Sequence, residues 1–118
     1  MRTGIVREYN RDMGSLNEQV RAKILEVIFR HLRADEWDVY LYGSFARGTA
    51  DTASDVDLAV RGPRMLAPAT AARIVADLED EVPLLREFDL IDLNQVPGEL
   101  RAKVLREGIR WNRATTER

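Results

Sequence analysis

Two aspartates, Asp55 and Asp57, stand two positions apart in a short stretch that alternates acidic and apolar residues. Successive side chains on a β-strand point to opposite faces, so both carboxylates project from one face, with their Cα atoms roughly 6.5–7 Å apart. Carboxylates at that separation can both reach two divalent cations about 3.5–4 Å apart, as in two-metal phosphoryl-transfer sites. Taken alone, the pair is a weak signal and is more typical of an ordinary half-solvated strand.

A second feature is Gly43-Ser44, which ends the preceding apolar run and is separated from Asp55 by ten residues. Glycine lets the backbone approach a ligand closely, and free N–H groups at a following helical turn can hold phosphate. Alone, this dipeptide also fits an ordinary tight turn. A strand, Gly-Ser, ten residues and then Asp-x-Asp on the next strand form a far more specific pattern than either feature by itself.

Hydrophobic periodicity predicts the elements that position these residues. A helix is predicted from Ser15, which has the spacing of a capping box with Glu18, to about Arg33. Short strands are predicted over 37–42, 55–60 and 88–93, helices over 68–81 and from about Pro97 to a cap at Gly108, with 109–111 as a candidate edge strand. This order predicts a small mixed α/β (α+β) domain whose helices cover a sheet.

Length and composition set limits on the whole chain. Its 118 residues predict a single domain over 1–118, with 1–14 as an N-terminal extension and 113–118 as a polar tail that are both less ordered. A net charge of −2 argues against binding to nucleic acid or an anionic membrane through net charge. The absence of cysteine excludes disulfides and thiolate metal sites, and the longest uncharged runs have eight residues. A cytoplasmic protein without a membrane segment is therefore expected.

The segment GSFARGTADTASDVDLAV resembles the nucleotidyltransferase signature of the DNA polymerase β superfamily, and in particular the small proteins called minimal nucleotidyltransferases. The order of elements extends the resemblance to about Gly108, so it covers most of the chain. It implies a polymerase β-like catalytic core. The residues at family spacing are Gly43, Ser44, Ala46, Arg47, Gly48, Ser54, Asp55, Asp57 and Leu58.

The resemblance also implies Mg²⁺-dependent transfer of a nucleoside monophosphate, with ATP as the expected substrate. Asp55 and Asp57 would hold two Mg²⁺ ions, and Gly43 with Ser44 would hold the triphosphate. Arg47 matches an arginine common in the family and would contact phosphate, although a surface cation explains this loop residue equally well. An oxygen nucleophile cannot approach a polyanionic triphosphate until cations neutralise it, which is the physical need for the metals.

The family requires a third carboxylate from a neighbouring strand, and the sequence offers Asp89 and Asp92. Three positions apart on a regular strand, they point to opposite faces, so only one of them can join the site. Alternation alone does not choose between them. The resemblance favours Asp89 and leaves Asp92 as a structural or rim residue.

Minimal nucleotidyltransferases commonly act as antitoxins in two-gene modules whose partner is a HEPN-domain ribonuclease toxin. The resemblance therefore implies transfer of AMP from ATP to a tyrosine of such a toxin. The alternatives are an antitoxin that binds its toxin stoichiometrically without essential catalysis, and nucleotidyl transfer to a small-molecule or RNA hydroxyl. Lys103, Arg106 and Arg110 are expected to share one face of a helical turn, as a surface for an acidic partner or as a solvated face.

Overall fold

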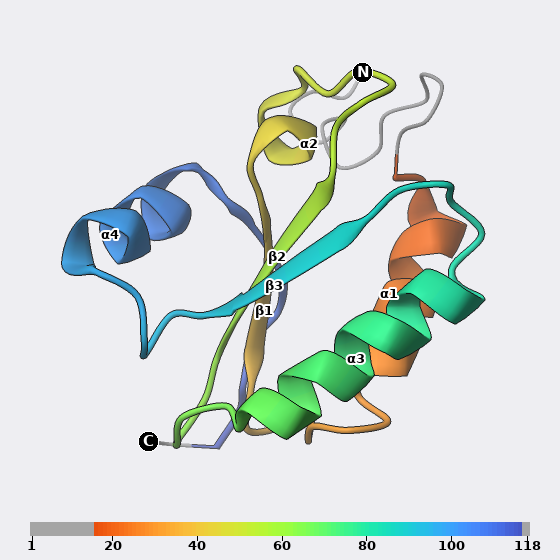
Figure 1. The fold of residues 1–118 in the computed structure, drawn as a ribbon. Coiled ribbons are helices and arrows are strands. Elements are labelled where there is room, and N and C mark those ends of the chain that lie inside the picture. Colours follow the sequence, from red (N-terminus) through yellow and green to blue (C-terminus); the bar gives the residue numbers. More distant parts are fainter. Residues whose placement is uncertain (1–15, 117–118) are drawn as a thin grey trace.

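The computed structural model describes residues 16–116 of the chain. The described residues form helices and strands that alternate along the sequence, with one short helical turn following the first strand (Figure 1). In chain order the elements are α1 (Glu18–Ile28), β1 (Asp38–Tyr42), α2 (Ser44–Arg47), β2 (Val56–Arg61), α3 (Pro68–Glu81), β3 (Phe88–Asp92), α4 (Gly98–Glu107) and β4 (Ile109–Asn112).

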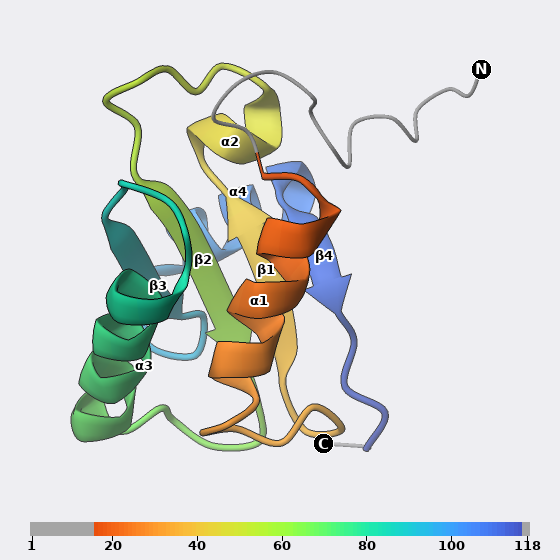
Figure 2. The same ribbon diagram turned by 90° about the vertical axis from the view of Figure 1, so that its right-hand side faces the viewer.

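The strands form one mixed four-stranded sheet in the order β3-β2-β1-β4. β1 is antiparallel to both β2 and β4, whereas β2 and β3 are parallel. Figures 1 and 2 show α1 and α3 side by side on one face of the sheet, while α4 lies against the other face. The mixed α/β fold predicted from the sequence is confirmed.

Both faces of the sheet bury apolar side chains, but to different extents. The larger core lies under α1 and α3, where Val56, Leu58 and Val60 of β2 are fully buried. A smaller cluster on the α4 face includes Ala59 and Val104. Because side chains alternate along a strand, Asp57 shares its face with Ala59 and therefore lies on the α4 side.

The first helix differs from its prediction at both ends. Asn17 caps it by accepting a hydrogen bond from the Val20 N–H (2.9 Å), while Ser15 of the predicted capping box lies outside the described residues. The helix ends at Ile28 instead of Arg33, because the Arg30 N–H bonds to the Val27 carbonyl, three residues back, and the chain tightens into turns.

The other predicted elements are found within one residue of their expected ends, and 109–111 is confirmed as part of the edge strand β4. The segment after Gly43, expected as a tight turn, forms the single helical turn α2. The predicted common face of Lys103, Arg106 and Arg110 is wrong. Because α4 ends at Glu107, Arg110 belongs to β4 and not to a helix.

Part of the predicted polar tail is tied to the start of β1. The Ala114 N–H donates to Asp38 Oδ1 (2.7 Å), and the N–H groups of Thr115 and Thr116 donate to the Asp35 carbonyl (2.9 and 2.8 Å). Residues 1–14 and 117–118 of the two predicted terminal segments lie outside the described part. Among the helices of residues 16–116, none has the length and apolar character needed to span a membrane.

We predict that Gly62→Ala destabilises the fold, because a Cβ at this position would meet the six-membered ring of the buried Trp37. Such overpacking costs about 1–3 kcal/mol in the free energy of unfolding, measured by urea denaturation. Gly98→Ala is the control, since none of the described atoms lies within 4 Å of a Cβ there. Equal denaturation midpoints for Gly62→Ala and the wild type would contradict the prediction.

The link between α1 and α3 predicts a pH dependence of stability. Arg30 donates two hydrogen bonds to the Glu81 carboxylate (2.7 and 2.9 Å), which lowers the pKa of Glu81 from an ordinary 4.5 to about 2. Because this pKa is depressed on folding, the pair stabilises the fold fully above pH 4.5, and the contribution is lost as the pH falls toward 2.

We therefore expect Glu81→Gln to lower the free energy of unfolding at pH 6 by more than it does at pH 3. The effect will be small because both side chains are partly exposed to solvent. Asp80→Asn removes a neighbouring exposed carboxylate of α3 and serves as the control in urea denaturation at both pH values. An effect of Glu81→Gln that is equal at the two pH values would contradict this assignment.

Candidate active site

The register of two parallel strands places the predicted carboxylates together. Asp57 of β2 is paired with Asp89 of β3, so their side chains project from the same face. Asp55 immediately precedes β2 and lies two positions before Asp57. Asp57 is half-buried, whereas Asp55 and Asp89 are exposed. The three predicted acidic residues thus lie at one end of the sheet, on the side that carries α4.

The negatively charged carboxylates of this group repel one another. Burial raises the pKa of Asp57 above its usual value, and the charges of Asp89 and Asp55 raise it further, while Arg47 acts in the opposite direction. Carboxylate oxygens gathered in this way are the donor set that Mg²⁺ prefers, so these residues fit a divalent cation. Within residues 16–116, no three His, Asp or Glu side chains already converge on one metal position. Sharing an ion therefore requires the aspartates to turn about their side-chain bonds.

Gly43 brings the backbone against the acidic group. It precedes α2 with φ +78° and ψ −156°, a conformation that favours glycine. A Cβ at this position would collide with Asp57 Oδ2, so glycine is also required by space. Ser44, the first residue of α2, and Arg47, its last, follow directly. The structure therefore brings Gly43, Ser44 and Arg47 to the same end of the sheet as the aspartates.

An arginine that the sequence did not single out shapes the loop before Asp55. Arg86 donates hydrogen bonds to the carbonyls of Asp51 (2.6 Å) and Ser54 (2.9 Å). Its guanidinium carbon also lies 5.2 Å from the ring centre of Phe45 in α2, within cation–π range. Arg86 thus connects α2 to the loop that leads into β2. An arginine just before β3 carries no sequence signal for this role, because its partners are carbonyls distant in the sequence.

Asp92 lies away from this group of carboxylates. It is buried on the other face of β3, where it accepts hydrogen bonds from the Leu66 N–H (2.7 Å), the Gln95 side chain (2.7 Å) and the Asn94 N–H (2.9 Å). These contacts tie the end of β3 to the segment before α3. Of the two aspartates between which alternation left the choice open, the structure places Asp89 beside Asp57 and gives Asp92 a structural position.

Tyr42 is a further member of the site that was missed in the sequence. It is paired with Asp57 across β1 and β2, and its hydroxyl donates to Asp89 Oδ2 (3.4 Å). Burial, followed by the charges of Asp89 and Asp57, raises the pKa of Tyr42 well above its usual value, so the phenol stays protonated as a donor. A tyrosine at the end of a buried strand suggests only core packing, and the register is needed to find its role.

The chain is similar to known nucleotidyltransferases in both sequence and fold. Residues 36–111 match the model of the family described as polymerase beta, nucleotidyltransferase. No curated protein sequence matches the chain significantly. A solved structure described as a candidate minimal nucleotidyltransferase is similar at 30% identity and TM-score 0.63, with 85% of this chain and 98% of that chain covered.

Two further similar structures come from toxin–antitoxin complexes. One complex, crystallised with AMP-PNP, contains a chain with TM-score 0.69 and 24% identity, covering 79% of this chain and 73% of that chain. The other is a tri-AMPylated Shewanella oneidensis HEPN toxin with its MNT antitoxin, at TM-score 0.65 and 20% identity, covering 86% and 74%. Both share the fold described above. The family match spans well over half of the residues of this chain, so this protein belongs to the polymerase β family of nucleotidyltransferases.

Proposed function

We propose that this protein transfers AMP from ATP to a tyrosine hydroxyl of a partner HEPN-domain toxin and thereby acts as its antitoxin. The observation that carries the proposal is the side-by-side placement of Asp57 and Asp89, with Asp57 lying against the backbone of Gly43. The structural neighbours support the choice of acceptor, because one of them is a complex of an AMPylated HEPN toxin with its antitoxin. Another was crystallised with the nucleotide AMP-PNP.

In this proposal Asp55, Asp57 and Asp89 supply the oxygen ligands for two Mg²⁺ ions. When bound, Mg²⁺ neutralises the triphosphate and polarises the phosphate that is attacked. The Gly43 backbone and Ser44 hold phosphate oxygens at the start of α2, and Arg47 lies at the other end of the same turn. The Tyr42 hydroxyl orients the carboxylate of Asp89 through their hydrogen bond.

The proposed step is an in-line displacement at the α-phosphate. The acceptor oxygen forms a bond to the α-phosphorus, and the bond from that phosphorus to the oxygen bridging to the β-phosphate breaks. Pyrophosphate leaves with the electron pair of the broken bond, and the hydroxyl proton passes to the Asp89 carboxylate. No covalent intermediate with the protein forms, and apart from the proton that Asp89 accepts, the residues of the site act by positioning and charge.

We predict that Asp57→Asn and Asp89→Asn each reduce AMP transfer at least about a hundredfold, because losing a metal ligand removes several kcal/mol of transition-state stabilisation. The measurement is the intact mass of a co-expressed HEPN partner after incubation with Mg²⁺ and ATP. Asp80→Asn, which changes an exposed carboxylate of α3, should transfer at the wild-type rate. Full neutralisation of the toxin by Asp57→Asn without any added mass would favour a stoichiometric antitoxin instead.

The two glycines with positive φ provide a matched pair of variants. Gly43 (φ +78°) and Gly48 (φ +77°) impose similar backbone strain on an alanine, but only the Cβ at position 43 would reach a described atom within 4 Å, namely in the Asp57 carboxylate. We expect the strain to lower the free energy of unfolding of both alanine variants by about 1 kcal/mol or more, so both should unfold at a lower urea concentration than the wild type.

Transfer should separate the two variants. Gly43→Ala displaces Asp57 and should lose transfer at least about a hundredfold, since a displaced ligand is equivalent to a missing one. Gly48→Ala should keep most of the wild-type rate of AMP transfer, measured at a temperature where circular dichroism shows both variants to be folded. Equal rates in the two variants would show that the close approach of Gly43 to Asp57 has no catalytic importance.

A further inference from the structure

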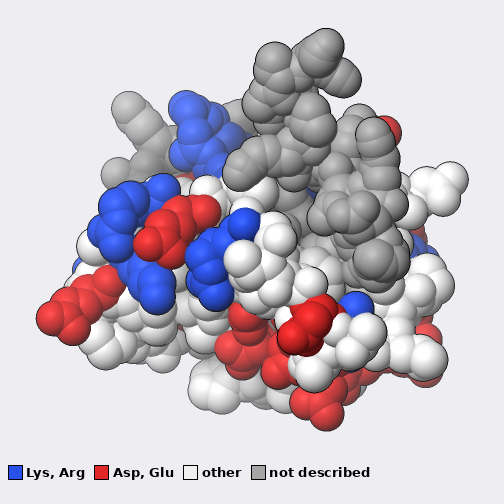
Figure 3. All heavy atoms as spheres, turned by 90° about the horizontal axis from the view of Figure 1, so that it is seen from above, with Lys and Arg blue, Asp and Glu red and all other residues white. Residues whose placement is uncertain are grey.

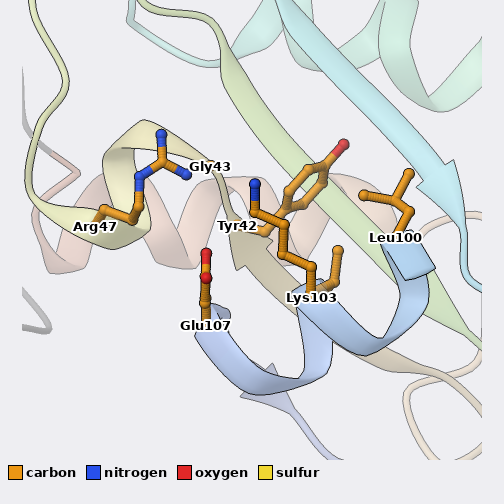
Figure 4. Close-up of a pocket in the computed structure, with 7 residues that line it drawn as sticks. Tyr42, Gly43, Arg47, Leu100, Lys103 and Glu107 are labelled. Atoms are coloured by element: carbon orange, nitrogen blue, oxygen red, sulfur yellow. The ribbon is translucent and has the colours of Figure 1, made fainter.

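A small hollow of about 110 Å³ lies beside the proposed site, between α2, the end of β1 and α4 (Figure 4). This volume is below the roughly 300–1,000 Å³ of a small-molecule site, so the hollow has room for only part of a ligand. Leu100 and Val104 contribute apolar surface, while the charged side chains come from two different elements (Figure 4). The residues that line it are Tyr42, Gly43, Arg47, Leu100, Lys103, Val104 and Glu107.

Two cations and one anion line this hollow, so its charge is positive overall. Arg47 comes from α2 and Lys103 from α4, and both are exposed. Among residues 16–116, neither side chain forms an ion pair or a hydrogen bond with another side chain. Figure 3 shows Lys and Arg side chains on the α4 side of this end of the molecule, with an acidic side chain among them and further acidic side chains beside them. A hollow with this charge suits an anionic ligand.

The sheet register fixes where the hollow lies relative to the reaction. Asp89, Asp57 and Tyr42 are paired in a row across β3, β2 and β1. The hollow is lined by Tyr42 and Gly43 at the end of β1, so it lies on the β1 side of this row, two strands from the β3 that carries Asp89. In an in-line displacement the leaving group departs opposite the attacking oxygen. With the acceptor on the Asp89 side, the pyrophosphate portion of ATP must extend toward Tyr42 and the hollow.

We propose that Lys103, together with Arg47, binds the β- and γ-phosphates of the nucleotide in this hollow and holds the leaving pyrophosphate. The inference rests on the proposed nucleotidyl transfer and adds a phosphate-binding residue from α4, outside the signature segment. Lys103 is spaced with Leu100, Val104 and Glu107 on one face of the helix, and this face is directed at the site. α4 thus supplies a basic side chain at the phosphate end of the site.

Glu107 should act on phosphate affinity in the opposite direction to Lys103. Its carboxylate also lines the hollow, where it would repel phosphate. A carboxylate oxygen of Glu107 lies 3.7 Å from a guanidinium nitrogen of Arg106, which does not line the hollow. Glu107→Gln removes the repulsion while keeping the shape of the side chain. Triphosphate affinity should therefore change in opposite directions in Lys103→Ala and Glu107→Gln.

The test is binding of ATP, AMP and pyrophosphate, each with Mg²⁺, to the whole protein by isothermal titration calorimetry. Lys103→Ala should weaken ATP and pyrophosphate about tenfold, the effect of losing one hydrogen bond to a charged group, and leave AMP unchanged. Lys103→Arg should restore the affinity, and Glu107→Gln should raise it. Arg106→Ala is the matched control, because it removes the same charge from the same helix outside the hollow.

The outcomes separate this inference from the proposed function. If the wild type transfers AMP but Lys103→Ala and Arg106→Ala bind ATP and pyrophosphate equally well, the assignment of Lys103 is overturned and the transferase is retained. A loss of affinity that is as large for AMP as for ATP also overturns it, because Lys103 would then act on the nucleoside monophosphate half. If the wild type neither binds ATP nor transfers AMP, the proposed function fails along with the inference.

Discussion

The repulsion between carboxylates held side by side is the constraint around which this molecule is built. The backbone hydrogen bonds of two parallel strands fix Asp57 beside Asp89, and partial burial makes the negative charge of Asp57 harder to tolerate. The opposite face of β2 supplies the stability that allows this, since Val56, Leu58 and Val60 are fully buried under α1 and α3. A stable apolar face thus supports a polar face on which like charges lie close together.

The surrounding elements bring positive charge and backbone to the carboxylates from three directions. Gly43 allows α2 to begin in contact with Asp57, and Arg86 fastens the loop before Asp55 while contacting α2 through Phe45. On the other side, α4 packs on the sheet through Val104 and so carries its polar residues toward the same end. The site is therefore assembled from segments spread over most of the described chain.

Much of the fold followed from the sequence because local signals agreed with the final packing. The helix over 68–81 and the strand endings were readable from periodicity and from Gly and Pro positions. The end of α1 was not, because Leu32 continues the apolar spacing although the chain there has already turned. Asp55 and Asp57 could be identified by spacing, whereas the place of Asp89 depends on strand register. Contributions such as that of Tyr42 arise from contacts distant in the sequence.

Asp92 gives β3 a means of rejecting incorrect pairings with β2. Its buried carboxylate accepts hydrogen bonds from the neighbouring Asn94 and Gln95 and from the Leu66 N–H, and the bond from Leu66, which is distant in the sequence, depends on the observed alignment. A slip by one residue would turn Asp92 toward α4 and drive Asp89 into the core, where a carboxylate without partners is costly. The misaligned chain would thus lose its acidic site and its stability together. Molecules that are folded but inactive through strand slippage should accordingly be scarce.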